Sequence, residues 1–159
     1  MAEEIILSKK VSENINSILK EYVSNTGVRC VLLISKSGQL VSENGFTSGL
    51  KVLSIAALIS SVFNSSQKLA SLLKEKMKEF FIEGTTWNIH YLQVTKELVF
   101  ASLFKKNILL GVVKAESKHV SKQINRILQN ASKPVKGVTH SEEEDEKKIY
   151  EFIGRLLQE

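Results

Sequence analysis

The chain has 159 residues, 43% of them hydrophobic, and its 22 Lys and Arg against 17 Asp and Glu give a formal net charge of +5. A chain of this length makes one domain and buries roughly 70% of the surface exposed by its unfolded form. The single cysteine, Cys30, excludes an internal disulfide and a four-cysteine zinc site. No apolar run reaches the roughly 18–20 residues that span a bilayer, and Glu3 and Glu4 stand where a signal peptide is basic. We therefore expect a cytoplasmic protein without a transmembrane segment.

The positive charge raises the question of nucleic acid, because phosphate binding needs a cationic surface. The lysines are interspersed with glutamates, and the densest stretch, residues 74–79, alternates in sign. This alternation is typical of a solvated helix end. We expect no nucleic-acid binding.

The first part of the chain predicts a helix followed by a β-hairpin. Apolar residues recur with the helical period over residues 7–23, and Gly27 suits the left-handed position that ends a helix. Two strand-like runs, residues 28–35 and 39–42, flank Gly38, which can take the positive φ of a tight turn.

Residues 50–73 predict a long helix with two apolar sides. The stripe expected to face the sheet consists of Val52, Ile55, Ile59, Val62, Leu69 and Leu73. The second side consists of Leu53, Ala57 and Leu58, with small residues at Ala56, Ala57, Ser60 and Ser61. Small residues let another backbone approach closely, and a helix with two apolar sides has two surfaces to bury. One of these surfaces would face its own sheet and the other a partner.

Three strands and a helix follow. Residues 77–83, 87–94 and 98–104 are rich in aromatic and β-branched residues, and their short connections make neighbouring strands antiparallel. Residues 108–128 begin like a strand, but the spacing from Leu109 onward keeps the apolar residues on one helical face. We expect a helix there.

The end of the chain predicts a linker over residues 131–140 and an amphipathic helix over 141–159. Ser141 and Glu144 have the spacing of a capping box. The apolar stripe of this helix consists of Ile149, Phe152, Ile153 and Leu156. It could dock on its own domain or on a partner, and the sequence leaves both open.

Patterns that carry catalytic or cofactor chemistry are missing from the sequence. It has no phosphate-binding loop of the G-x-x-x-x-G-K-[ST] form and no G-x-G-x-x-G turn. His90, His119 and His140 lack metal-ligand spacing and are interpreted as surface or half-buried polar residues. Cys30 is interpreted as a small core residue. We expect no enzyme activity, no metal and no cofactor.

The order of elements predicts an α+β fold with a five-stranded antiparallel sheet and helices on both faces. The hairpin of residues 31–41, the helix with Ala56-Ala57-Leu58 and residues 67–70, and residues 107–111 resemble the Roadblock domain of dynein light chains, with MglB-like members closest in character. The resemblance implies that the fold is of the Roadblock/profilin-like type. The division then is a Roadblock domain over residues 1–130, the linker over 131–140 and the C-terminal helix over 141–159.

The resemblance implies a homodimer, or a heterodimer with a paralogue. Strand 77–83, with Phe80, Phe81 and Ile82, would pair with its twin to make a ten-stranded sheet and remove an exposed edge. Two copies of helix 50–73 would lie antiparallel across one face. The residues expected in this partner and dimer helix are Leu53, Ala56, Ala57, Ser60, Ser61 and Asn64.

The resemblance also implies a platform for a small Ras-like GTPase, as MglB-type proteins activate GTP hydrolysis by an MglA-like partner in cell polarity. Activation would proceed without an inserted arginine finger, and helix 50–73 contains no arginine. The C-terminal helix could be a second contact to the GTPase. Alternatives are a structural adaptor or scaffold, as in the dynein and Ragulator members, or a small-molecule sensor with Trp87, His90 and Tyr91 as its polar cluster.

Overall fold

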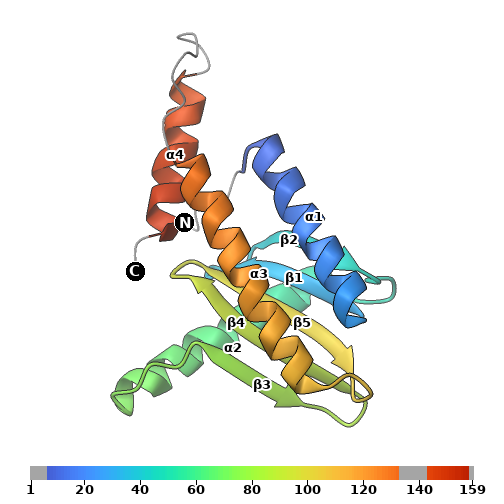
Figure 1. Ribbon diagram of the computed structural model, residues 1–159. Coiled ribbons are helices and arrows are strands. Elements are labelled where there is room, and N and C mark those ends of the chain that lie inside the picture. The colour runs from blue at the N-terminus through green and yellow to red at the C-terminus, as the bar shows by residue number, and fades with distance from the viewer. Residues whose placement is uncertain (1–6, 133–142, 158–159) are drawn as a thin grey trace.

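The computed structural model describes residues 7–132 and 143–157 of the chain. It has an α+β fold with a single sheet (Figure 1). The elements in chain order are α1 (Lys9–Thr26), β1 (Cys30–Ser35), β2 (Leu40–Gly45), α2 (Val52–Leu72), β3 (Glu79–Glu83), β4 (Trp87–Thr95), β5 (Leu98–Lys105), α3 (Leu110–Ala131) and α4 (Glu143–Leu157).

The five strands form one sheet in the order β2-β1-β5-β4-β3, and every neighbouring pair is antiparallel. This confirms the antiparallel sheet expected from the short connections. β2 and β3 are the two edges, and the β1–β2 register shifts between Leu33 and Ile34. Strand β3 therefore lies at an edge, as expected.

Helices cover both faces of this sheet, as predicted. α1 and α3 lie on one face and α2 on the other (Figure 1). The alternation along β1 shows why: Val31 and Leu33 pack in the core under α1 and α3, whereas Leu32 and Ile34 pack in the core under α2. A strand buried on both faces reads as a continuous apolar run, which is how residues 31–34 look in the sequence.

Buried hydroxyl groups connect the elements that surround the core under α1 and α3. The Tyr22 hydroxyl on α1 lies 2.7 Å from Ser102 Oγ on β5 and 3.1 Å from Ser117 Oγ on α3, so one hydrogen-bonded group joins three elements. Burial raises the pKa of Tyr22, so the phenol is neutral and can donate. The Tyr22 ring also meets Phe100 edge-on, 5.0 Å between centroids.

Two glycine predictions are confirmed, and one helix start is corrected. Gly27 ends α1 with φ 75°, and Gly38 has φ 95° in the β1–β2 turn. The sequence spacing predicts Leu109 on the inner face of the last domain helix, but this residue precedes α3 in extended conformation and is 74% exposed. α3 begins at Leu110, and its inner face starts at Val113.

The C-terminal helix α4 packs against α3 of the same chain (Figure 1). Ile153 and Leu156 are buried in the core under α1 and α3, and Ile149 and Phe152 pack against it. Of the two arrangements left open by the sequence, this structure has the one in which the helix docks on its own domain. The linker residues 133–140, with His140, and the capping-box residue Ser141 lie outside the described residues, so the domain division stays a prediction.

None of the helices among the described residues combines the length and the apolar character needed to cross a membrane.

Candidate interaction surface

The outward face of α2 is the largest concentration of exposed apolar side chains on the described part of the chain. Leu53, Leu58 and Leu72 are 72%, 65% and 83% exposed. The exposed large apolar residues of this face and the helix end are Leu53, Leu58, Val62, Leu69, Leu72 and Leu73. An apolar surface of this kind marks an interaction site or an aggregation liability, because water solvates it poorly.

The second half of α2 is rotated relative to the prediction. In the predicted sheet-facing stripe, Val52, Ile55 and Ile59 pack in the core under α2, as expected. Val62, Leu69 and Leu73 are exposed, and Phe63 and Ala70 are buried instead. Both sets have helical spacing, so periodicity alone does not choose between them. The packing of Phe63 determines which face of α2 points toward the sheet, because its ring packs edge-on against Tyr91 of β4 with 6.4 Å between centroids.

The rotation corrects the predicted partner set. Ala56 is fully buried in the core under α2, and Ser60 is buried with its Oγ donating to the Lys36 carbonyl at 2.6 Å. Asn64 Nδ2 donates to the same carbonyl at 3.0 Å. Ser60 and Asn64 therefore hold the β1–β2 turn of their own chain, and Ala56 and Ser60 do not belong to the outward surface. Leu53, Ala57 and Ser61 are exposed, as the prediction required.

The small residues of α2 have an intramolecular reason as well. A Cβ added at Gly38 would meet the Cα of Ala57 at 3.4 Å, so the turn and the helix backbone approach closely. A larger side chain in either place would push α2 away from the hairpin. The small residues were expected at a partner contact, but Ala57 and Ser60 also serve this close approach within the chain.

The edge strand β3 lies beside α2 and carries Phe80, Phe81 and Ile82. Phe80 stacks on Tyr91 at 5.3 Å, and Phe81 stacks on Phe104 on the opposite face at 6.3 Å. Phe81 and Ile82 are nevertheless 37% and 42% exposed. Because β4 is the only strand paired with β3 in the described part of the chain, one side of its backbone offers free hydrogen-bonding groups.

Aromatic rings connect α2 to this edge. Tyr91 contacts both Phe63 of α2 and Phe80 of β3, and Gln67 Nε2 of α2 donates to the Met77 carbonyl just before β3 at 2.6 Å. The exposed face of α2 and the edge of β3 are therefore held together as one unit, the α2–β3 surface.

A cluster of titratable side chains around the buried His90 lies on the other face of β3. His90 on β4 is fully buried, and its Nε2 lies 3.1 Å from Glu79 Oε1, which is also 3.3 Å from Lys114 Nζ of α3. Lys118 Nζ approaches Glu79 Oε2 at 3.8 Å. Burial, together with the charges of Lys114 and Lys118, lowers the pKa of His90 although Glu79 raises it, so the ring is neutral at pH 7. Burial raises the pKa of Glu79, but His90 and Lys114 outweigh this and lower it, so the carboxylate stays charged.

This cluster corrects two sequence interpretations. The sequence predicts a surface or half-buried residue at His90, but the side chain is enclosed between β4 and α3. The sequence also groups His90 with Trp87 and Tyr91 as a polar cluster for a small molecule. The side chains of successive residues in a strand point to opposite faces, so His90 lies under α3 while Tyr91 packs under α2. The three side chains do not converge.

Among the described residues no group of three or more His, Cys, Asp or Glu could hold a metal ion. Cys30 is free and buried, which confirms its interpretation as a core residue.

A five-stranded antiparallel sheet between helices, with an apolar helix face and an open edge strand side by side, defines an interaction domain of the Roadblock/profilin-like architecture. The Roadblock/LC7 domain model matches residues 14–104, and the chain belongs to this family.

Related proteins extend the likeness beyond that range. An uncharacterized protein of Aquifex aeolicus is 24% identical over 152 residues, which cover 93% of this chain and 94% of the relative. Among solved structures, Myxococcus xanthus MglB is 26% identical with a TM-score of 0.71, covering 73% of this chain and 95% of that one. The gliding protein MglB of Thermus thermophilus is 24% identical with a TM-score of 0.73, covering 80% of this chain and 97% of that one. The expected MglB-like membership of the family is confirmed.

Proposed function

We propose that this chain forms a homodimer through the α2–β3 surface and that the dimer binds and regulates a small Ras-like GTPase. The observation that carries the proposal is the α2–β3 surface itself: an exposed apolar helix face locked to an open edge strand, in a Roadblock/LC7 chain similar to MglB. Antiparallel pairing of two β3 strands would satisfy their free backbone groups and bring two α2 helices together.

The chain would act on the GTPase without a catalytic group of its own. α2 contains no arginine, so a dimer face built from it supplies no arginine finger. Regulation would then consist of holding the catalytic residues of the GTPase in position, which lowers the entropic part of the barrier. The proposal is therefore a GTPase-activating or exchange-modulating protein that is not itself an enzyme and that acts in the cytoplasm.

The alternative is a structural adaptor that joins other subunits and leaves nucleotide turnover unchanged. The same surfaces support it, because an apolar face binds whether or not the partner is a GTPase. GTP turnover separates the two.

The test measures single-turnover GTP hydrolysis and nucleotide exchange by a Ras-like GTPase from the same source, with and without the purified chain. Acceleration of either rate supports regulation. Binding with unchanged rates supports the adaptor, and failure of the GTP-loaded GTPase to bind contradicts the GTPase proposal. Ser24→Glu, which places the same charge on the exposed side of α1, on the face of the sheet opposite to α2, is the matched control for Leu58→Glu on α2.

A further inference from the structure

Cations collect along one side of α3. Residues four apart in a helix lie next to each other on its surface, and α3 carries its four basic residues at this spacing, over about 18 Å of helix. They are Lys114, Lys118, Lys122 and Arg126, which we call the α3 stripe. Lys114 is half-buried and the other three are exposed. The fold thus lines up cations that are separated in the sequence.

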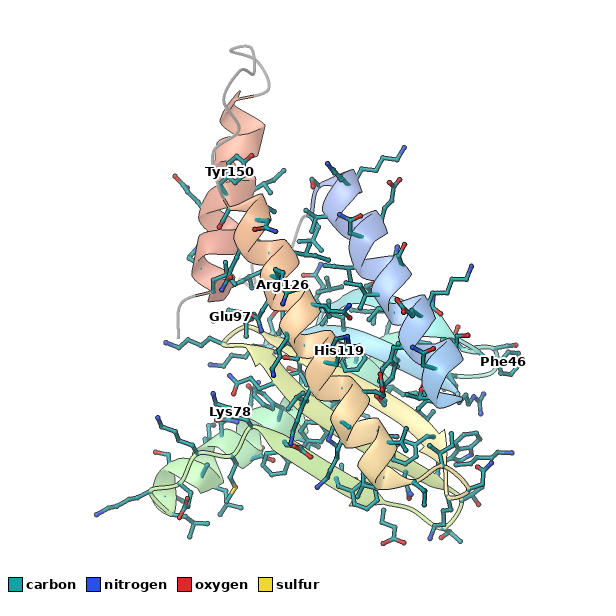
Figure 2. All side chains as sticks on the ribbon, in the orientation of Figure 1. Phe46, Lys78, Glu97, His119, Arg126 and Tyr150 are labelled. Atoms are coloured by element: carbon teal, nitrogen blue, oxygen red, sulfur yellow. The ribbon has the colours of Figure 1, made fainter. Side chains whose placement is uncertain are left out.

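The acidic residue of α3 lies on a different side of the helix. Glu116 is the only Asp or Glu in α3, and it lines the groove between α3 and α1 together with His119 and with Glu21 of α1. Figure 2 looks onto the outer side of α3, where Arg126 lies, with His119 toward α1. The outer side of α3 and the groove beside it therefore differ in charge.

One carboxylate from the sheet neutralises part of the stripe. Glu79 of β3 lies 3.3 Å from Lys114 Nζ and 3.8 Å from Lys118 Nζ, and the Lys118 side chain stays largely exposed. The side chains of Lys122 and Arg126 make no ion pair or hydrogen bond within the described part of the chain. Three exposed cations, two of them unpaired, are therefore available to an anionic partner.

Exposed apolar side chains stand at the start of the same helix. Leu109 directly precedes α3 and Val112 lies in its first turn, and both are exposed. The inner apolar side of α3 is buried in the core under α1 and α3, so the helix cannot turn that side outward. Binding to a membrane surface combines the attraction of cations to anionic lipids with the burial of apolar side chains. The outer side of α3 offers both.

We propose that the α3 stripe docks this chain on the surface of an anionic membrane, with Lys118, Lys122 and Arg126 at the lipid headgroups and Leu109 and Val112 against the lipid beside them. A row of cations on the convex outer side of a helix fits a flat charged surface, whereas peptides bind in grooves or along strand edges. α3 contains no Phe, Trp or Tyr on which a nucleic-acid base could stack.

Docking through α3 leaves the α2–β3 surface accessible, because α2 covers the opposite face of the sheet (Figure 1). In the proposed dimer, the pairing that brings two α2 helices to one face of the joined sheet brings two α3 stripes to the other. Two linked stripes bind a membrane more tightly than one. The contact needs neither the dimer nor a GTPase, so it is tested separately from the proposed function.

Vesicle sedimentation with the full chain tests the proposal. The vesicles consist of phosphatidylcholine alone or with about 30% phosphatidylserine, and binding is measured at about 0.05 and 0.5 M salt. The chain should sediment with the anionic vesicles at low salt, dissociate at high salt and stay in solution with phosphatidylcholine. Binding to neither kind of vesicle, or to both equally, would overturn the proposal.

Removing charges assigns the contact to α3. Each of Lys118→Gln, Lys122→Gln and Arg126→Gln should weaken binding to the anionic vesicles about fivefold. The matched control removes three exposed lysines in and next to α2, on the opposite face, and should keep most of the binding. These substitutions are Lys51→Gln, Lys68→Gln and Lys74→Gln. Equal losses in the two triple variants would overturn the stripe as the contact.

Two further measurements separate the contributions and the kinds of partner. Leu109→Ser should weaken binding without changing its salt dependence, because the leucine carries no charge, and a thermal melt checks that each variant is folded. A fluorescent peptide of ten glutamates is titrated in parallel. If this peptide binds and the anionic vesicles do not, the partner is an acidic protein segment and the membrane proposal is overturned.

Discussion

Glu79 and His90 face each other across the β3–β4 pair, with Glu79 Oε1 3.1 Å from His90 Nε2. Glu79 is the first residue of the edge strand, and the same carboxylate meets Lys114 and Lys118 of α3. The strand that offers its outer side to a partner is therefore tied to the covering helix by one ionised group. This connection makes the edge sensitive to protonation.

Acidification should destabilise the chain in two stages. The pKa of His90 is lowered by folding, so below the ordinary value of 6.5 the unfolded state binds more protons than the folded state and the free energy of unfolding falls. The pKa of Glu79 is also lowered, so its contribution is complete above 4.5 and is lost as the pH falls below that value. Urea unfolding at pH 7.5, 6.5, 5.5, 4.5 and 3.5 measures both.

His90→Gln should remove the first stage and reduce the second, because His90 contributes most of the lowering of the Glu79 pKa and Lys114 contributes the rest. The matched control is His119→Gln, which changes an exposed histidine on α3. If the free energy of unfolding of His90→Gln falls as steeply between pH 6.5 and 5.5 as that of the parent chain, another group is responsible for the first stage.

The dimer should depend on both parts of the α2–β3 surface. Ile82→Lys places a charge on the edge strand, where it opposes strand pairing, and Leu58→Glu places one on the outward face of α2. Light scattering of the parent chain should give twice 17.8 kDa down to low micromolar concentration, and each variant should shift toward 17.8 kDa. Ser24→Glu on the exposed side of α1 is expected to keep the mass of the parent. A monomeric parent chain would rule out the dimer.

Removing side chains of α4 should lower the stability of the whole domain. Ile153 is fully buried in the core under α1 and α3, so Ile153→Ala should cost about 2–4 kcal/mol in the free energy of unfolding. At this chain length each kcal/mol lowers the melting temperature by about 2–4 °C. Glu151→Ala on the exposed side of α4 should leave it within about 1 °C. Equal melting temperatures for parent and Ile153→Ala would mean that the helix is not docked in solution.

Gly45 and Gly49 both have positive φ, at 100° and 78°, but only one of them lacks space. A Cβ at Gly45 would lie 2.4 Å from the Arg29 carbonyl oxygen and 2.8 Å from the Cys30 Cα, whereas at Gly49 nothing lies within 4 Å. Gly49→Ala should therefore cost about 1–2 kcal/mol from the left-handed conformation alone. Gly45→Ala should cost about 1–3 kcal/mol more, because backbone atoms must move apart. Chemical unfolding of both variants gives the difference, and equal costs would contradict the crowding at Gly45.

Much of the fold follows from local signals in the sequence. Three kinds of signal each favour one local structure. They are the glycines at positions 27 and 38, the apolar run of residues 31–34, and the short connections after β3 and β4. The element order and the covering of both faces of the sheet follow from them. These signals are local, because turn chemistry and side-chain period act within a few residues.

The rotation of α2 and the placement of His90 are not predictable in the same way. Two apolar stripes with the same period exist in α2, and only the fit of Phe63 against Tyr91 selects the inner one. His90 stands in a strand that is covered on both faces. Its partner Glu79 is 11 residues away in the sequence, and Lys114, which also contacts Glu79, is 24 residues away from His90. Contacts between elements decide these features, and periodicity contains no information about them.

The two sheet edges are unequal. The pairing of β2 with β1 shifts register between Leu33 and Ile34 of β1, and β2 carries the exposed Glu43 and lies against α1. β3, in contrast, is a short aromatic strand that pairs with β4 in a regular register. If two sheets pair through their β3 strands, both β3 edges are covered. The combined sheet then ends at a β2 strand on each side, where the register is irregular. Edge-to-edge association through β3, as proposed, would thus be isologous and close at two copies, and it would not continue into a filament.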